Sequence, residues 1–221
     1  MAKRVGVVLS GCGFLDGAEV HEATLTLLAL DRRGAEAIAI APDLAQADVV
    51  DHQAHAPSRD GSRNALVEAA RISRGHVREL SAVSAKELDA LILPGGYGAA
   101  KTLSSFATDG PRMRVLGPLE ALIRALFQAQ KPMGFLCIAP VIAAKVLGES
   151  HPRLTIGDDA ETAAAIEAMG GRHVRCKVDE VIVDPDLHLV SSPAYMLGPS
   201  IAPVATGVDR LVAAVLDLSR A

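Results

Sequence analysis

Cys137 lies in the run 131–140, KPMGFLCIAP, between a short apolar stretch and a helical pattern. A strand that turns into a helix at this point projects the cysteine above the carboxyl edge of a sheet, where ligands bind in open α/β folds. The first N–H groups of such a helix favour a thiolate, and Pro140 suits its first turn. A thiol of pKa about 8.5 is only a few per cent ionised at pH 7, whereas a pKa near 6 makes it mostly thiolate. We therefore predict a nucleophilic thiol; a packed structural cysteine is the alternative.

A second strand end opens into glycines in the run 91–98, LILPGGYG. Gly95 and Gly96 would let backbone N–H groups approach a substrate oxygen closely, which suits an oxyanion site. An ordinary turn is the alternative interpretation. The spacings of the phosphate loop, GxxxxGK[ST], and of the dinucleotide motif, GxGxxG, are both absent.

Carboxylates and histidines near these segments supply candidate acids and bases. Glu19 and Glu22 lie one turn apart at a predicted helix start, where carboxylates usually complement the helix dipole. His21 and His151 are candidate bases only if the fold brings them to the cysteine. The acidic run 158–161 is expected to begin a helix rather than bind a metal, because no histidine accompanies it at ligand spacing.

The three cysteines are widely separated, so they form neither a disulfide framework nor a zinc pattern. For Cys12 and Cys176 we expect small buried side chains.

The net charge of -4 argues against a nucleic-acid partner. No run approaches the length of a membrane helix, and the apolar run 5–9 is too short for a leader. A cytoplasmic location is expected.

Apolar runs alternate with helical patterns over 221 residues, which predicts one α/β domain spanning residues 1–221 with a largely parallel sheet. The segment 43–62 is polar and is predicted to be a surface excursion. The pattern predicts strands at 5–9, 37–41, 88–93 and 133–136, and a hairpin of 178–183 with 187–191. It predicts helices at 18–33, 64–72, 116–130 and 208–218, and a further helix that begins after Cys137 and ends at residue 147.

Five separated motifs in order carry a family resemblance: SGCG at 10–13, EVHE at 19–22, PGGYGAAK at 94–101, GFLCIAP at 134–140 and SPAYM at 192–196. Together they resemble the ElbB family, named for enhancing lycopene biosynthesis, in the class I glutamine amidotransferase-like superfamily of PfpI-type proteases and deglycases. The resemblance implies a flavodoxin-like three-layer α/β/α sandwich with a nucleophile-elbow cysteine. It also implies a homodimer, no cofactor, and glyoxalase activity that converts glyoxal to glycolate. The family name suggests a link to isoprenoid production.

By the same resemblance, Cys137 is the nucleophile and Glu22 is the carboxylate that contacts its sulfur. Where the deglycase branch has a histidine, this chain reads LTIG at 154–157, which disfavours glutaminase and protease chemistry. We expect the pair to share one proton, with a raised carboxylate pKa, because two adjacent negative charges repel each other.

The mechanism that follows is addition of the thiolate to an aldehyde, giving a hemithioacetal, with a developing oxyanion held by N–H groups around Gly95, Gly96 and Ile138. The carboxyl group would then move a proton between the two carbons. The alternative function is a redox-sensing or regulatory amidotransferase-like protein, in which the thiol is oxidised or binds a partner. Amide hydrolysis is a third possibility.

Overall fold

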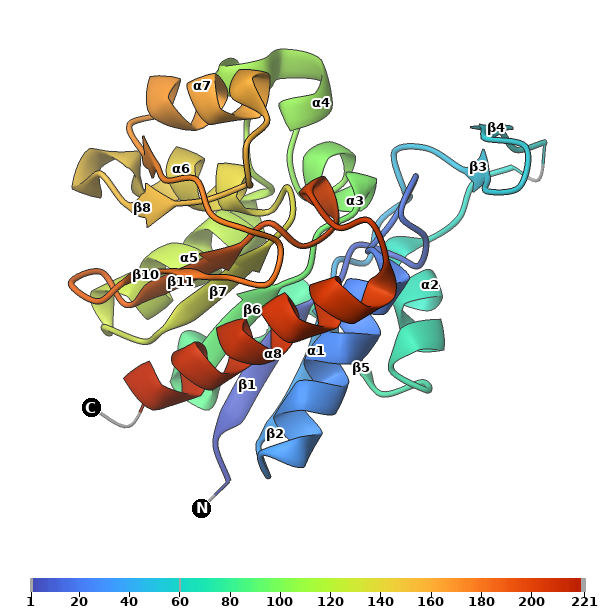
Figure 1. Cartoon of the computed structure of the whole chain (residues 1–221). Helices are drawn as coiled ribbons and strands as arrows, with labels where there is room; N and C mark the ends of the chain where they lie inside the picture. Colours follow the sequence, from blue (N-terminus) through green and yellow to red (C-terminus); the bar gives the residue numbers. More distant parts are fainter. Residues whose placement is uncertain (1, 60, 220–221) are drawn as a thin grey trace.

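The computed structural model describes residues 2–59 and 61–219. Its centre is a seven-stranded sheet in the order β10-β11-β7-β6-β1-β2-β5, parallel except where β10 pairs with β11 (Figure 1). The strands are β1 (Arg4–Val8), β2 (Glu36–Ala41), β5 (Val77–Glu79), β6 (Ala90–Leu93), β7 (Met133–Leu136), β10 (Ile182–Asp184) and β11 (Leu189–Ser192). The central strands are buried on both faces, which explains why they are apolar without alternation.

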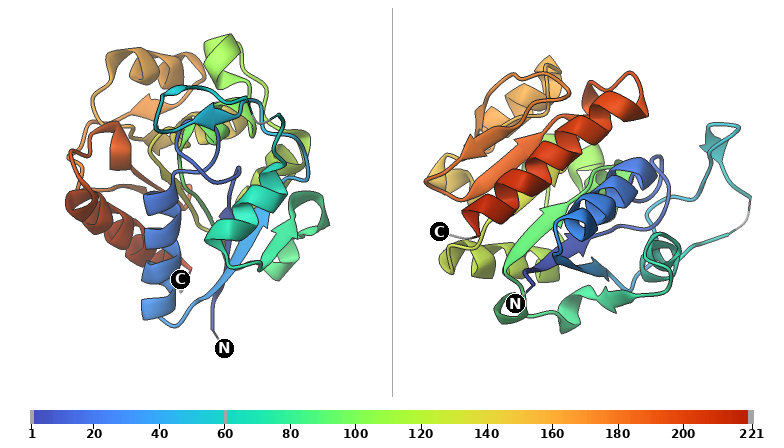
Figure 2. Two further views of the ribbon diagram at one scale, coloured as in Figure 1. Left: turned by 90° about the vertical axis from the view of Figure 1, so that its right-hand side faces the viewer. Right: turned by 60° about the horizontal axis from the view of Figure 1, so that its bottom comes forward.

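Helices cover both faces of the sheet and make the fold a three-layer α/β sandwich (Figures 1 and 2). One face carries α1 (Val20–Arg32), α2 (Ala65–Ile72) and α8 (Ile201–Leu218). The other carries α5 (Gly117–Gln128) and α6 (Pro140–Leu147), and α7 (Ala160–Ala168) packs on α6. Short helices α3 (Tyr97–Lys101) and α4 (Phe106–Asp109) follow β6. The predicted fold class is confirmed.

Two differences from the predicted elements have local causes. Helix α8 begins at Ile201, seven residues before the predicted start, because Pro203 lies in its first turn, where no N–H is needed. The predicted hairpin is confirmed, but its first strand is shorter than 178–183. Val178 lies instead against α8, where its carbonyl oxygen is so close to Gly207 that any side chain at that position would overlap it.

The polar segment 43–62 carries a two-stranded ribbon of β3 (Val50–Asp51) and β4 (Ala56–Pro57) that stands out from the sandwich (Figures 1 and 2). A second small pair, β8 (Arg153–Leu154) with β9 (Arg172–His173), is parallel. These two-residue strands have too few positions to show a periodicity, so the sequence does not predict them. Among the described residues, no helix is both long and apolar enough to cross a bilayer.

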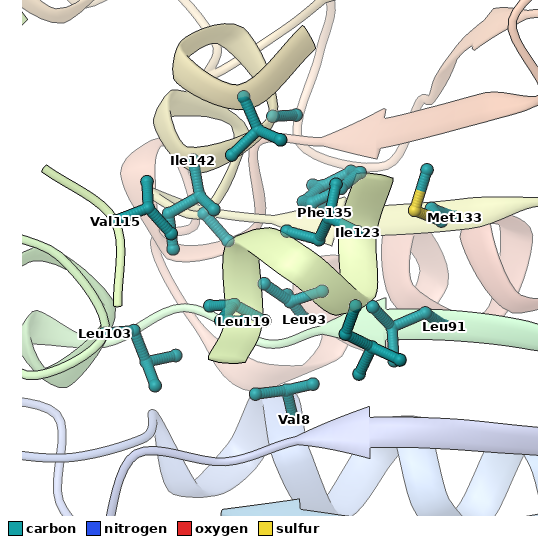
Figure 3. Close-up of a cluster of buried hydrophobic side chains, with 14 of the residues drawn as sticks. Val8, Leu91, Leu93, Leu103, Val115, Leu119, Ile123, Met133, Phe135 and Ile142 are labelled. Carbon is teal, nitrogen blue, oxygen red and sulfur yellow. The ribbon is translucent and has the colours of Figure 1, made fainter. Parts of the chain in front are cut away.

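Phe135 on β7 is fully buried in the cluster between the sheet and α5 (Figure 3). Its neighbours there include Leu93, Ile123 and Ile142. Because interiors are close-packed, aliphatic side chains around an aromatic ring leave a cavity when the ring is removed.

We predict that Phe135→Ala lowers the free energy of unfolding by about 3–5 kcal/mol, because the lost transfer energy adds to the energy of the cavity. Denaturant unfolding followed by circular dichroism measures it. The control is Val67→Ala on α2, where the side chain is 63% exposed and the expected change is within about 0.5 kcal/mol. Equal losses in the two variants would contradict the assigned core.

Candidate active site

Cys137 is the residue that follows β7 and precedes the start of α6. Its φ of 57° is in the left-handed region, which is unfavourable for a residue with a Cβ and is found where surrounding structure fixes the backbone. Its N–H donates to the carbonyl oxygen of Ser192 at 3.0 Å, which ties the turn to the neighbouring strand β11. The predicted strand–turn–helix position is therefore confirmed.

Glu22 lies in the first turn of α1 with its side chain fully buried. Its Oε2 accepts the N–H of Gly95 at 2.7 Å, and its Oε1 accepts the N–H of Tyr195 at 3.2 Å. The carboxyl group also shares a hydrogen bond with the thiol of Cys137. The predicted carboxylate–sulfur contact is thus present, and two backbone N–H groups orient it.

Glycine is required at positions 95 and 96 because the loop after β6 lies very close to Cys137, to Glu22 and to the backbone at Gly17. A side chain at Gly95 would overlap the Cβ of Cys137 and lie 2.9 Å from Glu22 Oε2. Gly96 has a φ of 93° and its Cα faces the carbonyl oxygen of Gly17. These positions let the loop after β6 pass directly over the sulfur.

The N–H groups at the sulfur differ in part from the expected set. Those of Gly96 and Ile138 hydrogen-bond to Cys137. That of Gly95 is bonded to Glu22, so it orients the carboxyl group and is not free to hold an oxyanion. Two of the three predicted donors, those of Gly96 and Ile138, therefore lie at the sulfur.

Burial, together with the Glu19 carboxylate, raises the pKa of Glu22 from 4.5 to about 7, although N–H bonds from Gly95 and Tyr195 oppose the shift. Burial and the nearby Glu22 also raise the pKa of the Cys137 thiol well above its usual value, more than the N–H groups at the sulfur lower it. The expectation of a lowered thiol pKa is therefore wrong. The raised carboxyl pKa agrees with the prediction in direction, but its causes are burial and Glu19, because the hydrogen bond from Cys137 lowers the pKa of Glu22.

The two candidate histidines have different places. His21 Nδ1 lies 2.7 Å from the hydroxyl of Tyr195, beside Glu22. His151 lies beyond the far end of α6, where its Nδ1 hydrogen-bonds to the carbonyl oxygen of Gly170 at 2.9 Å. Eight helical residues separate it from the cysteine turn by about 12 Å. His151 is therefore not a partner of the sulfur.

Tyr195 is the site residue that residue-by-residue reasoning missed. It follows β11 in the turn 194–196, and the signal for it is the SPAYM motif, whose residue types alone indicate no role.

Cys12 and Cys176 are half-buried, so the expectation that both are buried is wrong. Asp159 caps α7 by accepting the N–H of Thr162, as the acidic run predicts. Within 2–59 and 61–219, no group of three or more metal-binding side chains is suited to hold a metal ion.

No protein-family model matches the chain. The human mitochondrial protein "glutamine amidotransferase-like class 1 domain-containing protein 3" is 44% identical over 227 residues, covering 99% of this chain and 84% of its own length. The chain belongs to the glutamine amidotransferase-like class 1 family. A crystal structure of an "isoprenoid biosynthesis protein with amidotransferase-like domain" from Ehrlichia chaffeensis matches this family member with a TM-score of 0.91 and 34% identity, covering 98% and 99% of the two chains.

More distant structures share the fold of this amidotransferase-like chain. DJ-1beta of Drosophila melanogaster is 18% identical with a TM-score of 0.59, covering 100% of this chain and 97% of its own, and this likeness shows the fold alone. The predicted superfamily is confirmed, and the narrower ElbB resemblance stays a prediction.

We predict that wild-type stability falls as the pH rises from 5 to 8, because folding must bury a carboxyl group whose folded pKa of about 7 exceeds 4.5. The protonated group is favourable below pH 4.5, and that contribution is lost as Glu22 ionises through pH 7. The full difference is roughly 3 kcal/mol. Glu22→Gln should remove this part of the slope, measured by denaturant unfolding at several pH values. An unchanged slope in the variant would contradict the raised pKa.

Proposed function

We propose that this protein is a cofactor-independent glyoxalase that converts glyoxal, or a similar small dicarbonyl, to glycolate. The observation that carries the proposal is a buried thiol hydrogen-bonded to a buried carboxyl group, with two N–H groups directed at the sulfur. A nucleophile beside a base, under preset donors, suits addition to a carbonyl. The left-handed turn at Cys137 serves as the nucleophile elbow.

In the first step the Cys137 sulfur attacks one aldehyde carbon as the Glu22 carboxylate takes the thiol proton. A C–S bond forms, and the carbonyl oxygen gains the electron pair beside the N–H groups of Gly96 and Ile138. Glu22 then gives its proton to that oxygen, which completes a hemithioacetal. A carboxyl pKa of about 7 lets the group both accept and return a proton near neutral pH.

In the second step Glu22 removes the proton from the carbon bonded to sulfur, which leaves an enediolate whose negative charge lies on the oxygen of the other carbon. Return of the proton to the other carbon, with transfer of the hydroxyl proton from the first carbon's oxygen to the second carbon's oxygen, gives a glycolyl thioester of Cys137. The first carbon is thereby oxidised and the second is reduced. Water then cleaves the C–S bond, releasing glycolate and regenerating the thiol. The substrate and one water account for every atom, so the reaction needs no external oxidant.

The rival functions have less support. Oxidation sensing requires a thiol that ionises readily, whereas burial and Glu22 raise the pKa of Cys137. Amide hydrolysis by a nucleophile–histidine–acid triad requires a histidine beside the sulfur, which gives its proton to the leaving amine. His151 is bonded to Gly170, and the Nδ1 of His21 is engaged with Tyr195.

We extend the proposal to a homodimer that acts in the cytoplasm on a step linked to isoprenoid biosynthesis. The Ehrlichia relative is named as an isoprenoid biosynthesis protein, which supports the isoprenoid link. The human relative is named as mitochondrial, so cell fractionation decides the location. Light scattering tests the oligomeric state.

We predict that the wild type converts glyoxal without glutathione or metal, and that Cys137→Ala reduces turnover to the buffer background. Glu22→Gln should lower kcat by about 10²–10⁴-fold, the range for a lost acid–base group. Glycolate is quantified by chromatography. Cys176→Ala is the matched control, because this half-buried cysteine bonds to Thr155 and has no role in the proposed chemistry.

Absence of turnover in the wild type would overturn the glyoxalase proposal. Turnover that survives in Cys137→Ala would overturn the assigned nucleophile. Equal loss in Cys176→Ala would mean that folding, rather than chemistry, had been lost.

A further inference from the structure

One short segment touches both members of the reactive pair. The carbonyl oxygen of Ser192 accepts the N–H of Cys137 at 3.0 Å, and the N–H of Tyr195 donates to Glu22 Oε1 at 3.2 Å. Between them Ala194 has a φ of 43°, an unfavourable conformation for a residue with a Cβ. A turn with such a backbone keeps its geometry only when its surroundings hold it. The position of Tyr195 therefore needs an anchor.

That anchor is a side-chain hydrogen bond back to α1. The hydroxyl of Tyr195 lies 2.7 Å from His21 Nδ1, and His21 precedes Glu22 in the chain. Burial and the carboxylates of Glu19 and Glu22 raise the pKa of the Tyr195 phenol, so the hydroxyl keeps its proton at neutral pH. The phenol and the ring nitrogen share one hydrogen bond, in which the tautomer of His21 decides which group donates.

The other hydrogen bonds of this turn are internal. The N–H groups of Met196, Leu197 and Gly198 donate to carbonyl oxygens of residues 193–194. In the part of the chain that the structure describes, Tyr195 thus supplies both hydrogen bonds that join the turn to α1, one through its backbone and one through its side chain.

We propose that Tyr195, held by His21, is a positioning residue that keeps its own backbone N–H on Glu22 and so sets the proton affinity of the carboxyl group. This inference rests on the proposed function only for its kinetic readout. His21 thereby acts on the reactive pair through Tyr195, although it does not bond to the sulfur as a triad histidine would.

The direction of the expected effect follows from the hydrogen bonds of Glu22. An N–H donated to a carboxylate stabilises the charged form and lowers its pKa, as the Tyr195 N–H does here. Without the anchor the turn relaxes and this bond weakens, so the pKa of Glu22 rises further. The acidic limb of kcat/KM, where Glu22 must be ionised to accept the thiol proton, then moves to higher pH.

The test uses Tyr195→Phe, His21→Ala and the double variant. Each should move the acidic limb of kcat/KM upward by roughly half to one pH unit, the worth of one weakened hydrogen bond. The double variant should match either single variant, because all three lose the same hydrogen bond. His21→Asn, whose side-chain amide can either accept a hydrogen bond from the phenol or donate one to it, should restore the wild-type limb.

Matched controls come from the same residue types elsewhere. Tyr97→Phe changes the chain's other tyrosine, whose ring is half-exposed and packs near the Lys101 ammonium group. His76→Ala removes an exposed histidine beyond α2. Both should leave the limb in place. A variant that merely destabilised the fold would lower the rate at every pH and would not move the limb.

A second readout does not depend on glyoxal turnover. The rate at which iodoacetamide alkylates Cys137 is followed across pH by mass spectrometry of its peptide. The limb of this profile near neutral pH, where Glu22 must be ionised to take the thiol proton, should move to higher pH in the same variants. If the wild type turns over no glyoxal but the alkylation profile shifts as stated, the glyoxalase proposal fails and the positioning role stands. Unshifted profiles in Tyr195→Phe, or additive shifts in the double variant, would overturn the positioning role.

Discussion

The structure of the site depends on one electrostatic constraint: a thiol and a carboxyl group buried in contact cannot both be ionised. Burial raises the pKa of Glu22 to about 7 and that of Cys137 well above its usual value. Near neutral pH the pair therefore keeps at least one proton, and in the proposed reaction this last proton leaves the thiol only when a substrate takes the negative charge. In the proposed mechanism, the neighbouring carboxylate activates this buried thiol at the moment of attack, and a helix terminus does not activate it in advance.

The fold meets this constraint by bringing segments far apart in sequence to one edge of the sheet. Three adjacent strands, β6, β7 and β11, end there and supply Gly95, Cys137 and Tyr195, while α1 supplies Glu22. Each carboxylate oxygen receives one N–H from a different loop. A buried carboxyl group without such bonds would cost several kcal/mol, so these loops allow it to be buried. The same loops fix its direction toward the sulfur.

The sequence predicts the parts of this arrangement that depend on local pattern. Apolar runs predict the parallel strands except β5, whose three residues contain no apolar run, and the turn after residues 133–136 predicts the place of Cys137. Glu22 needed the family motif, because a carboxylate at a helix start is usually a surface group. Properties that depend on packing were missed: the raised thiol pKa, the use of the Gly95 N–H by Glu22, and the contact of Tyr195 with a helix 173 residues earlier in the chain.

The most direct test of the shared-proton pair is a carbon-13 NMR titration of the Glu22 carboxyl group. The resonance is assigned as the one absent from Glu22→Gln in protein labelled at glutamate side chains. We expect it to titrate with a midpoint near pH 7, because the group is buried beside the thiol. A midpoint near the ordinary value of 4.5 would contradict the account, since Glu22 would then be a permanent carboxylate with no proton to return.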